Sequence, residues 1–229
     1  MTAGTGPASG WLKPRRRPST YALKGKSTML LDAGSIEAVM DVIDTFGRPG
    51  CALISHAHLD HWSGLNALRW QGLNVYSHKS TFEHPYFKEI YDAPFDLNLI
   101  SMEYFKTYEI CDLNVTPFPL MHSIPATGFL IEGEKTLAYL LDTKGLPEKS
   151  LSLLKDSVDY AIIDSALPKD FDGPHNTYEK AVDLALELGV EKAFLVHLLP
   201  MLNVEEVLEL SERKGLKAEV PYDGQTFLL

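Results

Sequence analysis

Short apolar runs that end in polar turns fill the first half of the chain, and they predict β-strands. Residues 28–31 lead into an Asp-Ala-Gly turn, and residues 51–54 lead into Ser55 and His56. Between these runs, apolar side chains recur at helical spacing over residues 36–46, which predicts a helix with one buried face. The order strand, helix, strand indicates a sheet that is covered by helices.

The middle of the chain predicts more strands around one irregular stretch. We expect a short helix at 62–70, a strand at 73–76, and four further strands at 113–118, 128–132, 136–141 and 160–163. Residues 81–98 are aromatic and show no clear period. The rings of this stretch and the histidines near it could line a substrate cleft or pack within a loop, and packing is the expectation: His78, Phe82, His84, Tyr86, Phe87 and Tyr91.

The last third of the chain alternates between helix and strand. A helix is predicted over residues 178–188, and a strand over 192–196 delivers His197 at its end. Asn203 and Glu206 have capping-box spacing and open a helix that runs to about residue 214, before closing strands at 218–220 and 226–229. We therefore expect an α+β fold, a single domain over residues 1–229 with sheets sandwiched between helices.

Composition narrows the range of partners and locations. The 229 residues carry a formal net charge of −10, which argues against extended contact with a nucleic acid and leaves small anionic substrates open. Cys51 and Cys111 are isolated, so we expect neither a disulfide framework nor a cysteine-rich zinc module. No run is apolar enough to span a membrane or to act as a signal peptide. These features predict a soluble, cytoplasmic protein without membrane partners.

The turn after residues 51–54 carries the strongest chemical pattern. His56, His58 and His61 supply imidazoles and Asp60 supplies a carboxylate within six residues. These are ligand types that zinc and related metals accept at ~2.0 to 2.2 Å. Because alternate side chains of a turn can converge on different ions, the spacing predicts a metal site.

Three more candidate ligands stand at the ends of later predicted strands. His122 follows residues 115–121, Asp142 follows 136–141, and His197 follows 192–196. A single histidine in such a place is commonly an ordinary hydrogen-bonded residue. The ordered set of three indicates that they complete the metal site.

The pattern His-x-His-x-Asp-His, then His, then Asp, then His, resembles the metallo-β-lactamase superfamily over nearly the whole chain. The resemblance implies a four-layer αββα sandwich with a dinuclear site at one edge. It assigns one metal to His56, His58 and His122, the other to Asp60, His61 and His197, and the bridging position to Asp142. The common β-lactamases place Cys where Asp142 stands, and flavodiiron oxidoreductases place Glu where His58 stands. Neither group fits, so the resemblance favours the phosphodiesterase, glyoxalase and lactonase branches.

A second motif selects among these branches. Gly173-Pro174-His175-Asn176-Thr177 precedes the predicted helix at 178–188 and resembles the His-x-Thr element of ribonuclease Z and related phosphodiesterases. We expect His175 to contact a phosphate oxygen or to protonate the departing alkoxide. The alternative is a loop histidine near a helix start. The long tRNA-binding arm of ribonuclease Z has no counterpart here, since only a predicted strand pair separates His122 from Asp142.

The N-terminal region carries a weaker resemblance. Gly4-Thr5-Gly6, the basic run at 14–20 and the Asp32 turn resemble the cyclic phosphodiesterases of phosphonate breakdown. That group usually has a cysteine-rich zinc loop, which this chain lacks. Arg17 is a candidate contact for substrate phosphate, with a solvated basic turn as the alternative. Asp32 is expected to brace the metal-binding turn by hydrogen bonds.

Together these features predict a metal-dependent phosphodiesterase for small or cyclic phosphodiesters, with Asp60 orienting a hydroxide shared by two divalent ions and His175 assisting the leaving group. Zinc is the expected metal, with manganese or iron as alternatives. A homodimer is compatible with the sequence. The competing functions are a thioester or lactone hydrolase of the same superfamily and a metal-binding accessory protein without turnover.

Overall fold

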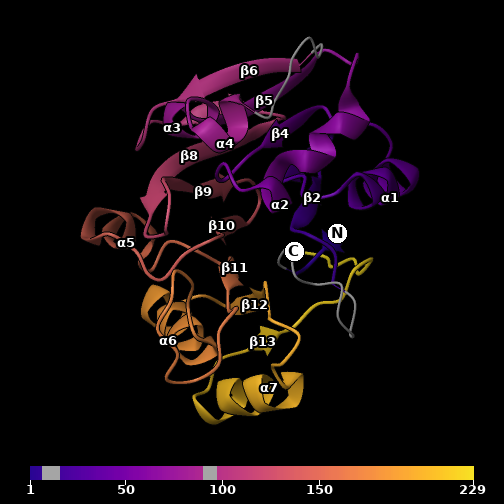
Figure 1. The fold of residues 1–229 in the computed structure, drawn as a ribbon. Coiled ribbons are helices and arrows are strands. Elements are labelled where there is room, and N and C mark those ends of the chain that lie inside the picture. The colour runs from indigo at the N-terminus through magenta and orange to yellow at the C-terminus, as the bar shows by residue number, and fades with distance from the viewer. Residues whose placement is uncertain (7–15, 90–96) are drawn as a thin grey trace.

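Two β-sheets face each other between outer layers of helices (Figure 1). The computed structural model describes residues 1–6, 16–89 and 97–229. The first sheet has the strand order β1-β2-β3-β4-β5-β6 and the second has the order β13-β12-β11-β10-β9-β8-β7. This is the predicted four-layer αββα sandwich.

The first sheet consists of β1 (Thr2–Gly4), β2 (Thr20–Lys24), β3 (Thr28–Leu31), β4 (Cys51–Leu53), β5 (Leu73–His78) and β6 (Leu97–Met102). The second consists of β7 (Tyr108–Ile110), β8 (Leu113–Leu120), β9 (Ala126–Glu132), β10 (Thr136–Leu140), β11 (Tyr160–Asp164), β12 (Lys192–Val196) and β13 (Ala218–Glu219). The helices beside the first sheet are α1 (Ile36–Phe46), α2 (Leu59–Trp62), the 3-10 helix η1 (Ser63–Leu68), α3 (Lys79–Phe82) and α4 (Pro85–Lys88). Those beside the second are α5 (Glu148–Leu154), α6 (Tyr178–Leu188) and α7 (Val204–Arg213).

The central strands are apolar on both faces because each sheet is covered on both sides. In β3, Met29 and Leu31 belong to the core between the sheets, whereas Leu30 belongs to the core under the helices of the first sheet. In β10, Tyr139 faces the other sheet, whereas Leu140 packs in the core under the helices of the second. Side chains of a strand alternate between faces, so continuous apolar runs are what a four-layer structure requires.

Several strand ends meet at one edge of the sandwich and position the chemical residues. Strands β10, β11 and β12 are parallel, and β8 is antiparallel to β9, which is antiparallel to β10. The carboxyl ends of β8, β10, β11 and β12 therefore lie on the same edge. The backbone N–H of Thr127 donates to the carbonyl of Ser55 at 2.9 Å and joins the two sheets at this edge. The turn after β4 and the strand ends of the second sheet are thereby brought side by side.

Some predicted elements differ from the structure. The predicted helix at 62–70 is α2 followed by η1; Gly64 lies so close to Ala33 and Ser35 that a side chain there would collide with their backbone. The irregular stretch 81–98 contains α4 and the start of β6. The closing strand at 226–229 is wrong: Phe227 packs against Phe194 instead of joining a sheet. Among the described residues, no helix is long and apolar enough to cross a membrane.

The cysteines also differ from expectation. Cys51 of β4 and Cys111, just after β7, form a disulfide between the two sheets. They are separated by 60 residues in the sequence, so local cysteine spacing could not predict this disulfide. The expectation of no disulfide was wrong, because the facing sheets bring together two cysteines that are distant in the sequence.

Candidate metal centre and active site

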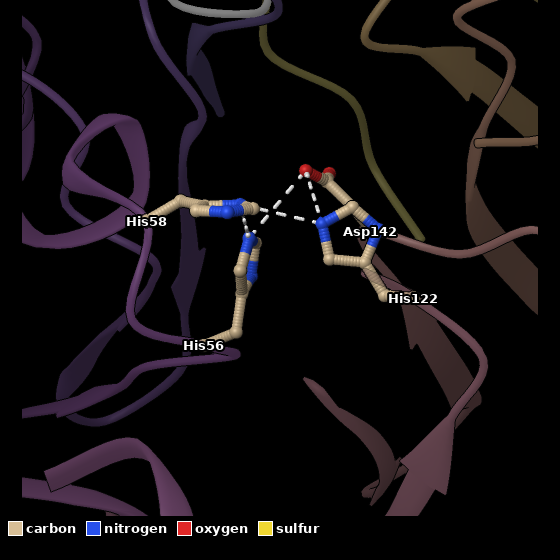
Figure 2. A group of neighbouring side chains, drawn as sticks. All are labelled: His56, His58, His122 and Asp142. Atoms are coloured by element: carbon tan, nitrogen blue, oxygen red, sulfur yellow. Dashed lines mark hydrogen bonds and ion pairs between the residues drawn. The ribbon is translucent and has the colours of Figure 1, made fainter. Parts of the chain in front are cut away.

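The first group of candidate ligands surrounds a common point (Figure 2). His56 and His58 come from the turn after β4, His122 follows β8, and Asp142 follows β10. His58 Nδ1 lies 2.9 Å from His56 Nε2 and 3.3 Å from His122 Nε2, and Asp142 Oδ2 lies 3.6 Å from His56 Nε2. Ligand atoms bound at ~2.0 to 2.1 Å to a tetrahedral ion stand about 3.3 Å apart. The spacing of these donor atoms therefore fits a metal ion.

A second group lies on the other side of Asp142. It contains Asp60, His61 and His197, whose donor atoms are mutually within 4.8 Å. Asp142 Oδ2 is 3.2 Å from His61 Nε2, and Asp142 Oδ1 is 3.6 Å from His197 Nε2. The carboxylate of Asp142 thus stands between the two groups, and the structure brings all seven sequence-predicted candidates together.

Buried polar atoms at this point support the fit. Within the described part of the chain, His61 Nε2, His197 Nε2 and Asp142 Oδ1 are buried and have no hydrogen-bond partner. Buried polar groups are nearly always paired, so each exception needs an explanation. A bound cation supplies one, since it satisfies the lone pairs of both imidazole nitrogens and carboxylate oxygens.

A family model described as a beta-lactamase superfamily domain matches residues 37–198, which include both groups. The chain belongs to the metallo-β-lactamase superfamily. This superfamily comprises metal-dependent hydrolases, and the donor set described above fits the divalent ions that they use.

Two related proteins are similar to this chain over part of its length. The nuclear ribonuclease Z of Triticum aestivum is 31% identical over 166 residues, covering 64% of this chain and 94% of that protein. The octanoyltransferase of Porphyromonas gingivalis is 28% identical over 158 residues, covering 64% of this chain and 31% of that protein. The chain therefore spans about a third of the length of this octanoyltransferase.

Solved structures share the whole fold. The metallo-β-lactamase fold protein YhfI from Bacillus subtilis has a TM-score of 0.83 at 17% identity, with 98% of this chain and 96% of that chain covered. A diphosphatase of the PhnP family has a TM-score of 0.81 at 19% identity, with 98% of this chain and 94% of that chain covered. At these identities the likeness establishes the four-layer metallo-β-lactamase fold.

Asp32 supports the candidate metal-binding turn through hydrogen bonds. It is fully buried in a left-handed conformation (φ 55°) at the end of β3. Its carboxylate accepts hydrogen bonds from Ser55 N (2.7 Å), Ser55 Oγ (2.8 Å), His61 Nδ1 (2.6 Å) and the Tyr139 hydroxyl (2.7 Å). Because Nδ1 of His61 donates to Asp32, Nε2 is the ring nitrogen that faces Asp142 and is left for a metal ion.

Two other histidines are oriented in the same way. His56 Nδ1 donates to Ser55 Oγ at 2.9 Å, since the hydroxyl proton is given to Asp32. His122 Nδ1 donates to the carbonyl of Pro174 at 2.9 Å. Each contact leaves Nε2 as the acceptor atom that faces the candidate metal site.

The electrostatics of the site favour bound positive charge. Burial lowers the pKa of His61, but the carboxylates of Asp142 and Asp32 outweigh burial and hold it well above its ordinary value. Burial raises the pKa of Asp142, but His197 and His61 hold it well below its ordinary range. Burial lowers the pKa of His58 to about 4, which keeps this imidazole neutral and available as a donor. The ionised carboxylates make the site attractive to cations, and a divalent ion would displace the proton from His61.

His175 lies beside the two groups and is paired with an aspartate that the sequence interpretation missed. Its Nδ1 is 2.7 Å from Asp164 Oδ2 and 3.9 Å from Asp142 Oδ2. Asp164 is fully buried at the end of β11 and also accepts hydrogen bonds from Thr143 N at 2.9 Å and Ala166 N at 3.1 Å. The strand-end position that identified Asp142 and His197 would have identified Asp164 too.

Arg17 is held in a network away from the histidines. Its guanidinium pairs with Asp41 at 2.6 Å and with Asp223 at 3.4 Å. Asp223 also accepts hydrogen bonds from Thr5 N at 3.0 Å and Arg17 N at 2.7 Å, while the carbonyl of Thr5 accepts from His197 N at 2.9 Å. The structure thus gives Arg17 a part in joining segments near the two ends of the chain next to His197, and its contact with substrate phosphate stays a prediction. Pro14, Arg15 and Tyr91 lie outside the described residues.

Proposed function

We propose that the protein is a metal-dependent phosphodiesterase that acts on small or cyclic phosphodiesters. The observation that carries the proposal is the His175–Asp164 pair, which stands next to the candidate metal groups with Nδ1 to Oδ2 at 2.7 Å. Hydrolysis of a phosphodiester expels an alkoxide, which needs a proton, and this pair is built to supply one. The relatives named as a ribonuclease Z and a PhnP-family diphosphatase support phosphoryl chemistry.

The proposed metal ligands are the residues of the two groups. His56, His58 and His122 would hold one divalent ion; Asp60, His61 and His197 would hold a second, with Asp142 shared between them. Zinc is proposed because its usual ligands match this set, with manganese or iron as alternatives. When bound, two such ions would make water nucleophilic at neutral pH and neutralise charge on the phosphoryl oxygens.

His175 is proposed as the acid for the leaving group. Burial opposes its charged form, but the hydrogen bond and charge of Asp164 raise the pKa of His175 to about 9. The imidazole therefore carries a proton at neutral pH, with Nδ1 engaged by Asp164 and Nε2 left to donate to the departing oxygen. The carboxylate of Asp60, 3.9 Å from His197 Nε2, is proposed to orient the attacking water.

The size of the substrate follows from the connection between His122 and Asp142. It consists of β9, β10 and short turns, and leaves no room for an RNA-binding arm. The net charge of −10 also disfavours a polyanionic partner. We therefore propose a small phosphodiester, such as a cyclic phosphate or a short nucleotide, as substrate.

A substrate panel tests the proposal. Metal-loaded protein is expected to turn over bis(p-nitrophenyl) phosphate and 2′,3′-cyclic nucleotides with kcat/KM at least about tenfold above its values for lactones and thioesters, because two ions can neutralise both non-bridging oxygens of a phosphodiester. The reaction is followed by absorbance and by chromatography. Faster turnover of a lactone or thioester would overturn the proposal, and no turnover of any substrate would favour the accessory protein without activity.

A further inference from the structure

An exposed aromatic ring lies beside the candidate metal site. Tyr86, the second residue of α4, is 51% exposed, and its ring centroid is 6.1 Å from that of the candidate ligand His58. By contrast, the rings of His78 and Tyr104 are stacked at 3.8 Å and nearly parallel. The Tyr86 ring is thus too far from His58 for full stacking, and half of its surface is open to solvent.

The position of Tyr86 is fixed by its neighbours in α4. The backbone N–H of Tyr86 donates to His84 Nδ1 at 3.2 Å, which caps the helix. Phe87 is buried and packs against Trp62 with 4.7 Å between ring centroids. Trp62 Nε1 in turn donates to the carbonyl of Ala57 at 3.0 Å, between His56 and His58 in the chain. The helix that carries Tyr86 is therefore attached to the metal-binding turn itself.

The attachment of α4 does not require the tyrosine ring. Phe87 provides the buried contact, and the Tyr86 backbone provides the cap contact. A large aromatic side chain held half exposed beside a site, on an element that other groups anchor, is suited to binding a ligand.

Other exposed apolar side chains stand on the loops that carry site residues. Each is within four residues of His58, His122, His175 or His197 along the chain: Leu59, Met121, Phe171 and Met201. A polar candidate metal site whose residues are flanked in the chain by exposed apolar side chains suits a substrate that has both an anionic and an apolar part.

We propose that Tyr86 is a specificity-determining residue that stacks on a planar aromatic group of the substrate, a nucleobase in the biological case. This inference rests on the proposed phosphodiesterase function and narrows it to phosphodiesters that carry a base beside the scissile phosphate. Stacking of a base on an aromatic side chain depends on the π-face of the ring and not on its hydroxyl.

A matched pair of substrates isolates the contact. Adenosine 2′,3′-cyclic phosphate and methyl ribofuranoside 2′,3′-cyclic phosphate share the scissile group and differ in the base. In metal-loaded protein, Tyr86→Ala is expected to lower kcat/KM for the adenosine substrate about 10- to 100-fold, mainly through KM. The base-free substrate should change less than about twofold, and Tyr86→Phe should retain the preference. Trp70→Ala, which removes an exposed ring from the turn after η1, is the control and should leave both values unchanged.

If Tyr86→Ala lowers kcat/KM equally for both substrates, or for neither, the stacking inference is overturned. Turnover by the wild-type protein would still support the phosphodiesterase proposal in that case. If the wild-type protein hydrolyses neither substrate, the function proposal fails. Calorimetric binding of AMP then still tests whether the Tyr86 ring stacks on a base. Binding at least about tenfold weaker to Tyr86→Ala would support stacking, and equal binding would contradict it.

Discussion

Asp142→Asn is expected to lower kcat/KM for phosphodiesters by about 1,000-fold or more and to reduce the bound metal. The Asp142 carboxylate is buried between the two candidate groups and lies within 4 Å of His56, His61 and His197. Asparagine keeps the size of the side chain but removes the negative charge that both groups share. Loss of metal-based stabilisation worth several kcal/mol corresponds to this fall in rate.

Metal content by mass spectrometry and initial rates on bis(p-nitrophenyl) phosphate check this expectation. Asp183→Asn, on the exposed face of α6, is the matched control and should behave as wild type. A thermal melt shows whether the variant is folded. A folded Asp142→Asn protein that binds the same amount of metal and keeps its rate within tenfold would contradict the shared role of Asp142.

His175→Ala is expected to lower turnover of 2′,3′-cyclic nucleotides about 100- to 10,000-fold, because the departing ribose oxygen loses its proton donor. The loss should be much smaller for bis(p-nitrophenyl) phosphate, since p-nitrophenolate leaves without protonation. Bound metal should stay at the wild-type level, because the proposed ligand set does not include His175. Asp164→Asn should lower turnover less than His175→Ala does, but again more for cyclic nucleotides than for bis(p-nitrophenyl) phosphate, since Asp164 acts through His175.

The two substrates are compared for each variant by initial rates, with metal content measured in parallel. His78→Ala is the control histidine variant, because His78 stacks on Tyr104 outside both groups. Equal losses on both substrates would indicate that His175 binds phosphate instead of protonating the leaving group. Unchanged turnover of cyclic nucleotides would remove His175 from the mechanism altogether.

The layers of this fold follow from sequence where periodicity is strong. Helix α1 covers residues 36–46 and α6 covers residues 178–188, as their spacing predicts, because each buries one face and has a clear cap. Short edge strands such as β1 and β7 have three residues each and show no period. They are strands because a neighbouring strand supplies hydrogen bonds, which local sequence does not reveal.

The site was predictable to the extent that its residues stand next to recognisable strands. His122, Asp142 and His197 all follow apolar runs whose ends meet at one edge. Asp164 follows such a run as well, but the superfamily pattern contains a single aspartate between His122 and His197, which Asp142 matches. The partners of Arg17 could not be foreseen, since Asp223 is 206 residues away in the sequence.

The orientation of Tyr86 depends on tertiary packing in the same way. The sequence shows Tyr86 and Phe87 as adjacent rings with no sign of which one is buried. Phe87 is buried because it packs against Trp62, and Tyr86 is therefore left exposed near His58. The expectation that the whole aromatic stretch packs a loop therefore does not hold for Tyr86, which is 51% exposed.

The most direct test of the dinuclear phosphodiesterase is a metal titration of chelator-treated protein with turnover of bis(p-nitrophenyl) phosphate as the readout. With Zn²⁺, Mn²⁺ or Fe²⁺ added in separate series, activity should be absent at the start and should rise to a plateau near two equivalents for at least one metal. A protein that binds two equivalents of metal and hydrolyses no phosphodiester, or one that hydrolyses it fully without metal, would contradict the account.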